Sequence, residues 1–207
     1  PGTSGAEGAG EAPPAGQDKL TASGNNLYAG VTSEEAAKFS HKYELNSRLV
    51  KRDVRLVEEV YRAGTPDGKV PAGRYAQFLN RSIAHLELAA QQAEPAQADV
   101  IRKLIRYYQT GEKADWYAYN IAWVSLAGNV DFIQGFVEVY LDPLGSKGVW
   151  ESVVSFVDTQ QTHLMRSFAE NAQYFEGRAP WLDAYKKEAV KPPVANVITV
   201  GSETGES

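Results

Sequence analysis

The clearest pattern of hydrophobic and polar positions in the chain runs from Val130 to Gly145, VDFIQGFVEVYLDPLG. Its second half alternates, with Phe136, Glu138 and Tyr140 on one face and Val137, Val139 and Leu141 on the other. This alternation predicts a β-strand with one fully apolar face. Two positions apart on a strand, the Glu138 carboxylate and the Tyr140 phenol would lie about 6.6–6.8 Å apart, close enough to contact one ligand. The segment 142–145, DPLG, then predicts a turn.

Hydrophobic residues elsewhere recur mostly at helical spacing. This spacing predicts helices over 33–39, 49–61, 71–92, 95–110 and 149–175. The first follows a capping box that begins at Thr32, and Pro95 and Gly111 bound the fourth. The very short link between the third and fourth helices predicts an antiparallel helical hairpin. The segment 115–124 holds two Trp and two Tyr, and we interpret it as a core helix rather than a pocket lining.

Two segments depart from the helical pattern. Residues 194–200, VANVITV, are rich in β-branched side chains and predict a buried strand. Residues 1–27 are dominated by Gly, Ala, Pro and Ser, a composition typical of a disordered tail or linker. Many helices with at least two strands far apart in the sequence predict an α+β fold, mostly helical.

Composition excludes several classes of function. The 207 residues include no cysteine, which excludes disulfides, thiolate metal sites and a cysteine nucleophile. The net charge of −5 argues against a nucleic-acid partner. No apolar run approaches the ~20 residues of a membrane span. The lack of cysteine favours the cytoplasm, but export stays open because the sequence begins with Pro rather than Met.

A complete active site is not visible in the sequence. His41, His85 and His163 are scattered, and none has a second ligand at metal-binding spacing. No nucleophile elbow or phosphate-binding motif occurs, and 201–205, GSETG, lacks the lysine of a phosphate loop. Glu138 and Tyr140 remain as candidates, and the alternative is that they form the solvated face of an antiparallel sheet.

Three segments together resemble the dipeptidyl-peptidase III family of zinc metallopeptidases. They are 101-IRKLIRYYQTGEKADWYAYNIAWV-124, 135-GFVEVYLDPLG-145 and 150-WESVVSF-156. Upstream, 30-GVTSEEAAKF-39 and 45-LNSRLVK-51 are similar to the bacterial branch of that family. Downstream, 170-ENAQYFE-176 and 195-ANVITVGSETGES-207 continue the similarity, which covers roughly residues 28–207.

The resemblance implies a two-lobed enzyme that releases dipeptides from the N-termini of short peptides. It also implies a zinc ion held by an H-E-x-x-G-H type helix and a later Glu, which this sequence does not contain. We therefore expect an N-terminal part of a parent peptidase, inactive and without zinc or another cofactor when alone. By the same resemblance, Glu138 binds the substrate's amino terminus and Tyr140 stabilises the oxyanion. The expected partners are a short peptide and the remainder of the parent polypeptide.

The resemblance also suggests a domain organisation. We expect residues 28–149 to form the lower-lobe helices and the substrate strand, 150–180 a helix that crosses to the zinc-bearing upper lobe, and 181–207 a strand that returns to the lower lobe. A non-catalytic peptide-binding or scaffolding domain with the same lobe architecture is the alternative function.

Overall fold

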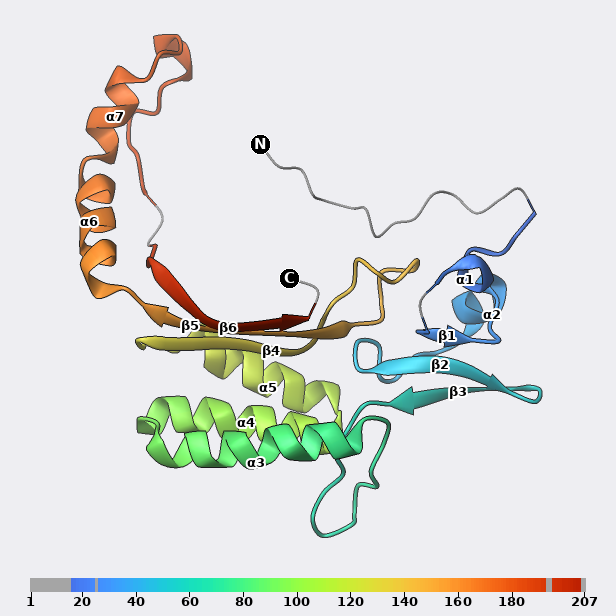
Figure 1. The fold of residues 1–207 in the computed structure, drawn as a ribbon. Helices are drawn as coiled ribbons and strands as arrows, with labels where there is room; N and C mark the ends of the chain where they lie inside the picture. Colours follow the sequence, from blue (N-terminus) through green and yellow to red (C-terminus); the bar gives the residue numbers. More distant parts are fainter. Residues whose placement is uncertain (1–15, 25, 193–194, 206–207) are drawn as a thin grey trace. The chain divides into compact units, whose positions relative to one another are not determined.

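A computed structural model describes residues 16–24, 26–192 and 195–205. Helices and short strands are mixed, which confirms the predicted α+β class (Figure 1). The elements in chain order are α1 Lys19–Ala22, β1 Tyr28–Ala29, α2 Ser33–Lys38, β2 Ser47–Arg52, β3 Arg55–Val60, α3 Ala76–Gln92, α4 Pro95–Thr110, α5 Lys113–Val124, β4 Val130–Glu138, β5 Val149–Val157, α6 Thr159–Glu170, α7 Ala172–Arg178, a 3₁₀ turn Asp183–Tyr185 and β6 Ile198–Gly205.

The chain divides into two compact units. Among the described residues, the first comprises 16–24, 26–127, 134–151 and Gly205, and the second comprises 128–133, 152–192 and 195–204. Strands β4 and β5 run from one unit into the other, within a sheet of order β4-β5-β6. The predicted lobe boundaries near residues 150 and 180 stay predictions. No helix in the described parts of the chain has the length and apolar character needed to cross a bilayer.

The first unit contains a three-stranded sheet of order β1-β2-β3, where the sequence predicted a helix over 49–61. That prediction was wrong. Strand β1 pairs parallel with β2, and β2 pairs antiparallel with β3, from Ser47 opposite Val60 to Arg52 opposite Arg55. Asp53 takes a positive φ of 53° in the turn between them, a conformation that Asp tolerates better than most residues.

Charged residues explain why this hairpin looked helical in the sequence. Arg48 and Glu59 lie opposite each other on β2 and β3, and Arg48 Nε is 2.6 Å from Glu59 Oε2. Arg52 binds the other oxygen of the same carboxylate. These cross-strand pairs stabilise a sheet, but along the sequence the same residues simply separate apolar positions at helical intervals.

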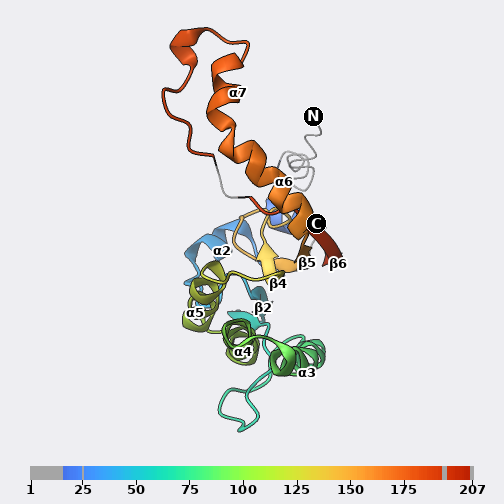
Figure 2. The ribbon, with the colours of Figure 1, turned by 90° about the vertical axis from the view of Figure 1, so that its left-hand side faces the viewer.

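Helices α3 and α4 form the antiparallel hairpin predicted from the sequence, and α5 packs against α4 (Figures 1 and 2). Helix α4 begins at Pro95 and ends before Gly111, whose φ of 70° gives the expected left-handed cap. Helix α3 begins at Ala76 rather than at residue 71, because Tyr75 has a positive φ of 62°. In α5 only Tyr119 is buried, so the prediction of a core helix holds for one face of α5.

The segment 149–175 was predicted to be one long helix, and this was wrong. Strand β5 occupies Val149–Val157, and Asp158 then caps α6 by accepting a hydrogen bond from Gln161 N at 2.9 Å. Four Val and a Phe in β5 favour a strand, and β4 and β6 supply its partners.

The last predicted strand is present but differs in position and burial. Strand β6 begins at Ile198, four residues later than predicted, and all its residues are exposed rather than buried. Residue 194, where the prediction began, lies outside the described residues. The sequence 201–205, GSETG, is part of this strand and therefore does not form a phosphate-binding loop.

The predicted disordered tail over residues 1–27 was too long. Residues 1–15 and 25 lie outside the described residues, but α1 begins at Lys19, capped by the Asp18 carboxylate. Leu20 and Leu27 are buried in a cluster that includes Leu49 of β2, and Leu144 packs against this cluster. The composition of this segment is poor in apolar residues and therefore predicted disorder, but Leu20 and Leu27 are buried beside the sheet.

Candidate functional site

The two sequence-predicted site residues lie at the end of strand β4. Glu138 is the last residue of the strand and is partly exposed, whereas Tyr140 lies two residues beyond the strand and is 42% exposed. Because the strand stops at Glu138, the spacing expected for two residues of one strand does not apply to this pair. Phe136, on the same face as Glu138, is buried. The face is therefore not a uniformly solvated one.

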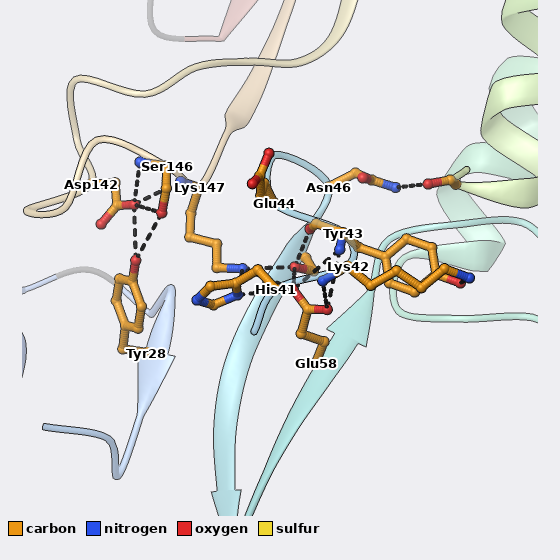
Figure 3. A network of polar contacts seen from close by, with 12 residues as sticks. Tyr28, His41, Lys42, Tyr43, Glu44, Asn46, Glu58, Asp142, Ser146 and Lys147 are labelled. Atoms are coloured by element: carbon orange, nitrogen blue, oxygen red, sulfur yellow. Dashed lines mark hydrogen bonds and ion pairs between the residues drawn. The ribbon is translucent and has the colours of Figure 1, made fainter. Parts of the chain in front are cut away.

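The segment 139–148, which we call the site loop, connects β4 to β5 and carries Tyr140. Asp142 organises it (Figure 3): one carboxylate oxygen, Oδ2, accepts hydrogen bonds from Ser146 N at 2.8 Å and Lys147 N at 2.7 Å. The other oxygen accepts from Leu144 N at 3.0 Å. Asp142 thus closes the turn that DPLG predicted, in the structural role expected for Asp in a turn.

Asp142 also joins the site loop to strand β1. The Tyr28 hydroxyl donates to Asp142 Oδ2 at 3.0 Å and lies 3.3 Å from Ser146 Oγ (Figure 3). Burial raises the pKa of the Tyr28 phenol well above its usual range, and the neighbouring Asp142 carboxylate acts in the same direction. The phenol therefore stays protonated and continues to donate at any physiological pH.

Lys147, near the other end of the site loop, is a buried cation. Its side chain is fully buried, and Nζ lies 2.8 Å from Ser47 Oγ and 3.4 Å from Glu58 Oε1 (Figure 3). Burial lowers the pKa of Lys147, and the Glu58 carboxylate opposes this shift. A buried ammonium without a partner would be costly, and strands β2 and β3 supply the partners here.

Glu58 receives hydrogen bonds from several directions. Backbone N–H groups of Lys42 and Tyr43 donate to Oε2 at 2.8 and 3.1 Å. Burial raises the pKa of Glu58, but these hydrogen bonds, His41 and the Lys147 charge together hold it below its usual value. The carboxylate is therefore ionised at neutral pH and balances the buried ammonium.

His41 contacts both charged groups through one ring nitrogen. Its Nδ1 lies 3.0 Å from Glu58 Oε1 and 3.1 Å from Lys147 Nζ. This nitrogen can donate to the carboxylate or accept from the ammonium, but it cannot do both at once. His41 thus contacts both members of the ion pair between Lys147 and Glu58. No spacing in the sequence indicated this position.

An aromatic cluster lies beside β4. Phe136 packs against Tyr61 at a ring-centroid distance of 4.6 Å and edge-on against Trp150 at 5.2 Å. A pocket of about 580 Å³ opens at this cluster and is lined mainly by apolar side chains, among them Tyr61, Tyr75, Leu79, Phe136 and Trp150. Through Phe136, this aromatic packing holds strand β4 close to its end at Glu138.

Comparison with known proteins identifies the family of this chain. The profile described as Peptidase family M49 matches residues 34–202, which is most of the sequence. The chain belongs to peptidase family M49. The resemblance seen in the sequence, to dipeptidyl-peptidase III enzymes, is therefore confirmed at the level of the family.

Several curated relatives of this M49 chain are named dipeptidyl peptidase 3. Dipeptidyl peptidase 3 of Dictyostelium discoideum is 28% identical over 123 residues, which is 58% of this chain and 18% of the relative. The enzyme of the same name from Rattus norvegicus is 27% identical over 127 residues, 60% of this chain and 17% of the relative. The chain thus spans less than a fifth of the length of these relatives.

Solved structures of dipeptidyl-peptidase III share the fold. The enzyme from Caldithrix abyssi aligns with a TM-score of 0.65 and 21% identity over 88% of this chain and 35% of its own. The enzyme from Corallococcus sp. strain EGB aligns with a TM-score of 0.59 and 20% identity over 87% of this chain and 34% of its own.

The described residues of this M49 chain do not form a metal centre on their own. In the described ranges 16–24, 26–192 and 195–205, no three His, Asp or Glu side chains are grouped as metal ligands. His85 and His163 are exposed on α3 and α6, in different units.

The sequence did not predict the ion pair between Lys147 and Glu58. Lys147 follows a Gly-Ser pair in an apparent surface loop, and Glu58 reads as one of several charges around 51–59. Only Asp142 gave a local signal, through its place before Pro in a turn. The pairing of Lys147 with Glu58 spans 89 positions in the sequence, so no motif could indicate it.

Proposed function

We propose that this chain contributes the substrate-binding strand of a zinc-dependent exopeptidase that releases dipeptides from the N-termini of short peptides. Glu138 binds the free α-amino group of the substrate, and Tyr140 donates a hydrogen bond to the oxyanion that develops at the scissile carbonyl. Membership of peptidase family M49, with relatives named dipeptidyl peptidase 3, carries this proposal.

The chemistry of the two side chains supports these roles. A carboxylate that binds an ammonium group forms a charge-assisted hydrogen bond, and it fixes the distance from the peptide's amino terminus to the cleaved bond. A phenol is a suitable donor to developing negative charge. Glu138 ends a strand held by the aromatic cluster, and Tyr140 follows in an anchored loop.

The zinc ion of the proposed enzyme requires ligands outside this chain. We place them in the remainder of the parent polypeptide. When bound, zinc would polarise the scissile carbonyl and activate water. Alone, this chain is expected to be inactive, and stoichiometric zinc in the purified 207-residue chain would contradict that expectation.

The decisive experiment uses Glu138→Gln in the full-length parent peptidase, with one peptide substrate in free and N-acetylated forms. Hydrogen bonds to charged groups contribute about 1.5–3 kcal/mol, so kcat/KM on the free peptide should fall about 10- to 100-fold. The acetylated peptide should be hydrolysed slowly by both proteins. Glu87→Gln, at an exposed position on α3, is the matched control.

Two results would contradict the proposal. Unchanged kinetics of Glu138→Gln on the free peptide would remove Glu138 from the binding site. A zinc-loaded parent protein that binds peptides without hydrolysing them would instead support the alternative, a non-catalytic peptide-binding or scaffolding domain.

A further inference from the structure

The site loop, residues 139–148, is attached to the β1-β2-β3 sheet near both of its ends. We propose that Asp142 and Lys147 are positioning residues that hold this loop, and with it Tyr140, in the geometry required for the reaction. The inference rests on the proposed role of Tyr140. Asp142 and Lys147 would act on Tyr140 through the backbone of the site loop.

The first attachment lies two residues after Tyr140. Asp142 N donates to Val139 O at 3.0 Å, so the backbone on both sides of Tyr140 belongs to one hydrogen-bonded turn. The Asp142 carboxylate accepts from the Tyr28 hydroxyl, and Tyr28 lies in β1, next to β2. Leu144, in the same turn, packs against the apolar cluster around Leu20. The turn is thus held by polar and apolar contacts together.

The second attachment is the buried ammonium of Lys147. Its Nζ contacts Ser47 of β2 and Glu58 of β3, and the adjacent Gly148 N donates to Leu45 O at 2.9 Å. The loop cannot move away from these strands without separating a buried ion pair, which is strongly unfavourable. A lysine that merely closed a surface loop would not need a fully buried side chain.

The two proposed site residues depend on this arrangement to different degrees. Glu138 belongs to strand β4, so the sheet holds it. Tyr140 lies outside the strand and is 42% exposed, so burial contributes little to its position. Loosening the loop should therefore impair the step that uses Tyr140 and leave recognition of the amino terminus intact.

The experiment compares Lys147→Met and Asp142→Asn with the unaltered full-length peptidase. Hydrogen exchange of the peptide covering residues 139–148 should become at least about tenfold faster, because each variant removes buried hydrogen bonds that close the loop. The value of kcat should fall, whereas the preference for free over N-acetylated peptide should persist. Lys113→Met is the matched control, because Lys113 also contacts a carboxylate, Glu44 at 3.1 Å, but is half exposed on α5.

A double variant separates positioning from general stability. In a Tyr140→Phe background, Lys147→Met should cause no further loss of kcat, because the group that it positions is already absent. An equal loss in both backgrounds would overturn the inference. Unchanged exchange of 139–148 in both Lys147→Met and Asp142→Asn would also overturn it.

Two further variants keep the test decisive. If Lys147→Met or Asp142→Asn does not fold, two other variants allow the same comparison. Ser47→Ala removes the hydroxyl that accepts from Lys147 Nζ, and Tyr28→Phe removes the hydroxyl that donates to Asp142. If Tyr140→Phe itself leaves kcat unchanged, the proposed function of Tyr140 is wrong. The attachment of the loop is then supported or overturned by its exchange rate alone.

Discussion

Lys147 Nζ lies 2.8 Å from Ser47 Oγ, although 100 positions separate the two residues in the sequence. Glu58 completes the contact with a carboxylate 3.4 Å from the same ammonium. The loop after strand β4 is therefore held by charge and hydrogen bonding as well as by apolar packing. This arrangement leads to specific expectations about activity and stability.

Tyr140→Phe in the full-length peptidase should lower kcat by about 10²–10³-fold, the usual cost of losing one hydrogen-bond donor to an oxyanion. KM should change much less, because the donor acts mainly in the transition state. Steady-state kinetics on a free peptide measure both. Tyr117→Phe, at an exposed position on α5, should leave kcat unchanged. A Tyr140→Phe protein with full kcat would contradict the proposed role.

Acid should weaken the fold through Glu58. Its pKa is below the usual value in the folded protein, so between the two values the unfolded chain binds more protons. Ionised Glu58 therefore stabilises the folded protein. This contribution to the free energy of unfolding is complete above about pH 4.5 and is lost as the pH falls through the pKa of Glu58 in the folded protein. Denaturant unfolding of Glu58→Gln should show lower stability at pH 7 and a shallower decline on acidification.

The control for Glu58 is Glu87→Gln, which alters an exposed carboxylate on α3. It should change neither the stability at pH 7 nor the decline in acid. Equal stability of Glu58→Gln and the unaltered protein at pH 7 would show that the buried ion pair contributes nothing to the fold.

Gly148→Ala should destabilise the protein because no space exists for a side chain. A Cβ at this position would lie 2.6 Å from Phe136 O and 3.1 Å from Leu45 O. Backbone atoms on both sides cannot give way cheaply, and overpacking of this kind costs about 1–3 kcal/mol. Thermal or denaturant unfolding measures the loss.

Gly177→Ala provides the opposite case in helix α7. Nothing lies within 4 Å of a Cβ there, and the residue is helical. The replacement should be neutral or stabilise by up to about 1 kcal/mol, because Ala favours a helix over Gly. If the Gly148→Ala protein were as stable as Gly177→Ala, the backbone around Gly148 would accommodate a Cβ without cost.

Leu20→Ala tests whether the N-terminal segment belongs to the fold. Leu20 is 3% exposed in the apolar cluster with Leu27 and Leu49, and truncating a buried leucine costs about 2–4 kcal/mol. Leu88→Ala, at a position 59% exposed on α3, should cost far less. Equal stabilities of the two variants would mean that residues 16–24 contribute little.

Local patterns in the sequence were sufficient for several elements. The capping box of α2, the Pro95 start and Gly111 end of α4, the helical hairpin and the turn at Asp142 are all confirmed. The caps and the turn depend on residues within a few positions of one another, so short-range hydrogen bonds and backbone preferences decide them. The hairpin follows from the short link between its two helices.

The incorrect predictions share a physical cause. Segments 49–61 and 149–157 carry apolar residues at intervals compatible with a helix, but both form strands. A strand is stable only when another strand accepts its hydrogen bonds, and local spacing does not contain that information. Leu20 was likewise assigned to a disordered tail, because its neighbours in the sequence are polar and its apolar partners lie in β1 and β2.

The sequence by itself indicated the family, the α+β class and a strand in the segment before Asp142, although that strand ends at Glu138 rather than at Leu141. Tyr140 and Glu138 as site residues stay predictions that kinetics must test. Only the tertiary structure decided what holds the loop behind them, because the partners of Asp142 and Lys147 lie about 90 to 115 positions away. Burial of a charge is a property of the assembled fold, and it appears only when distant strands close around it.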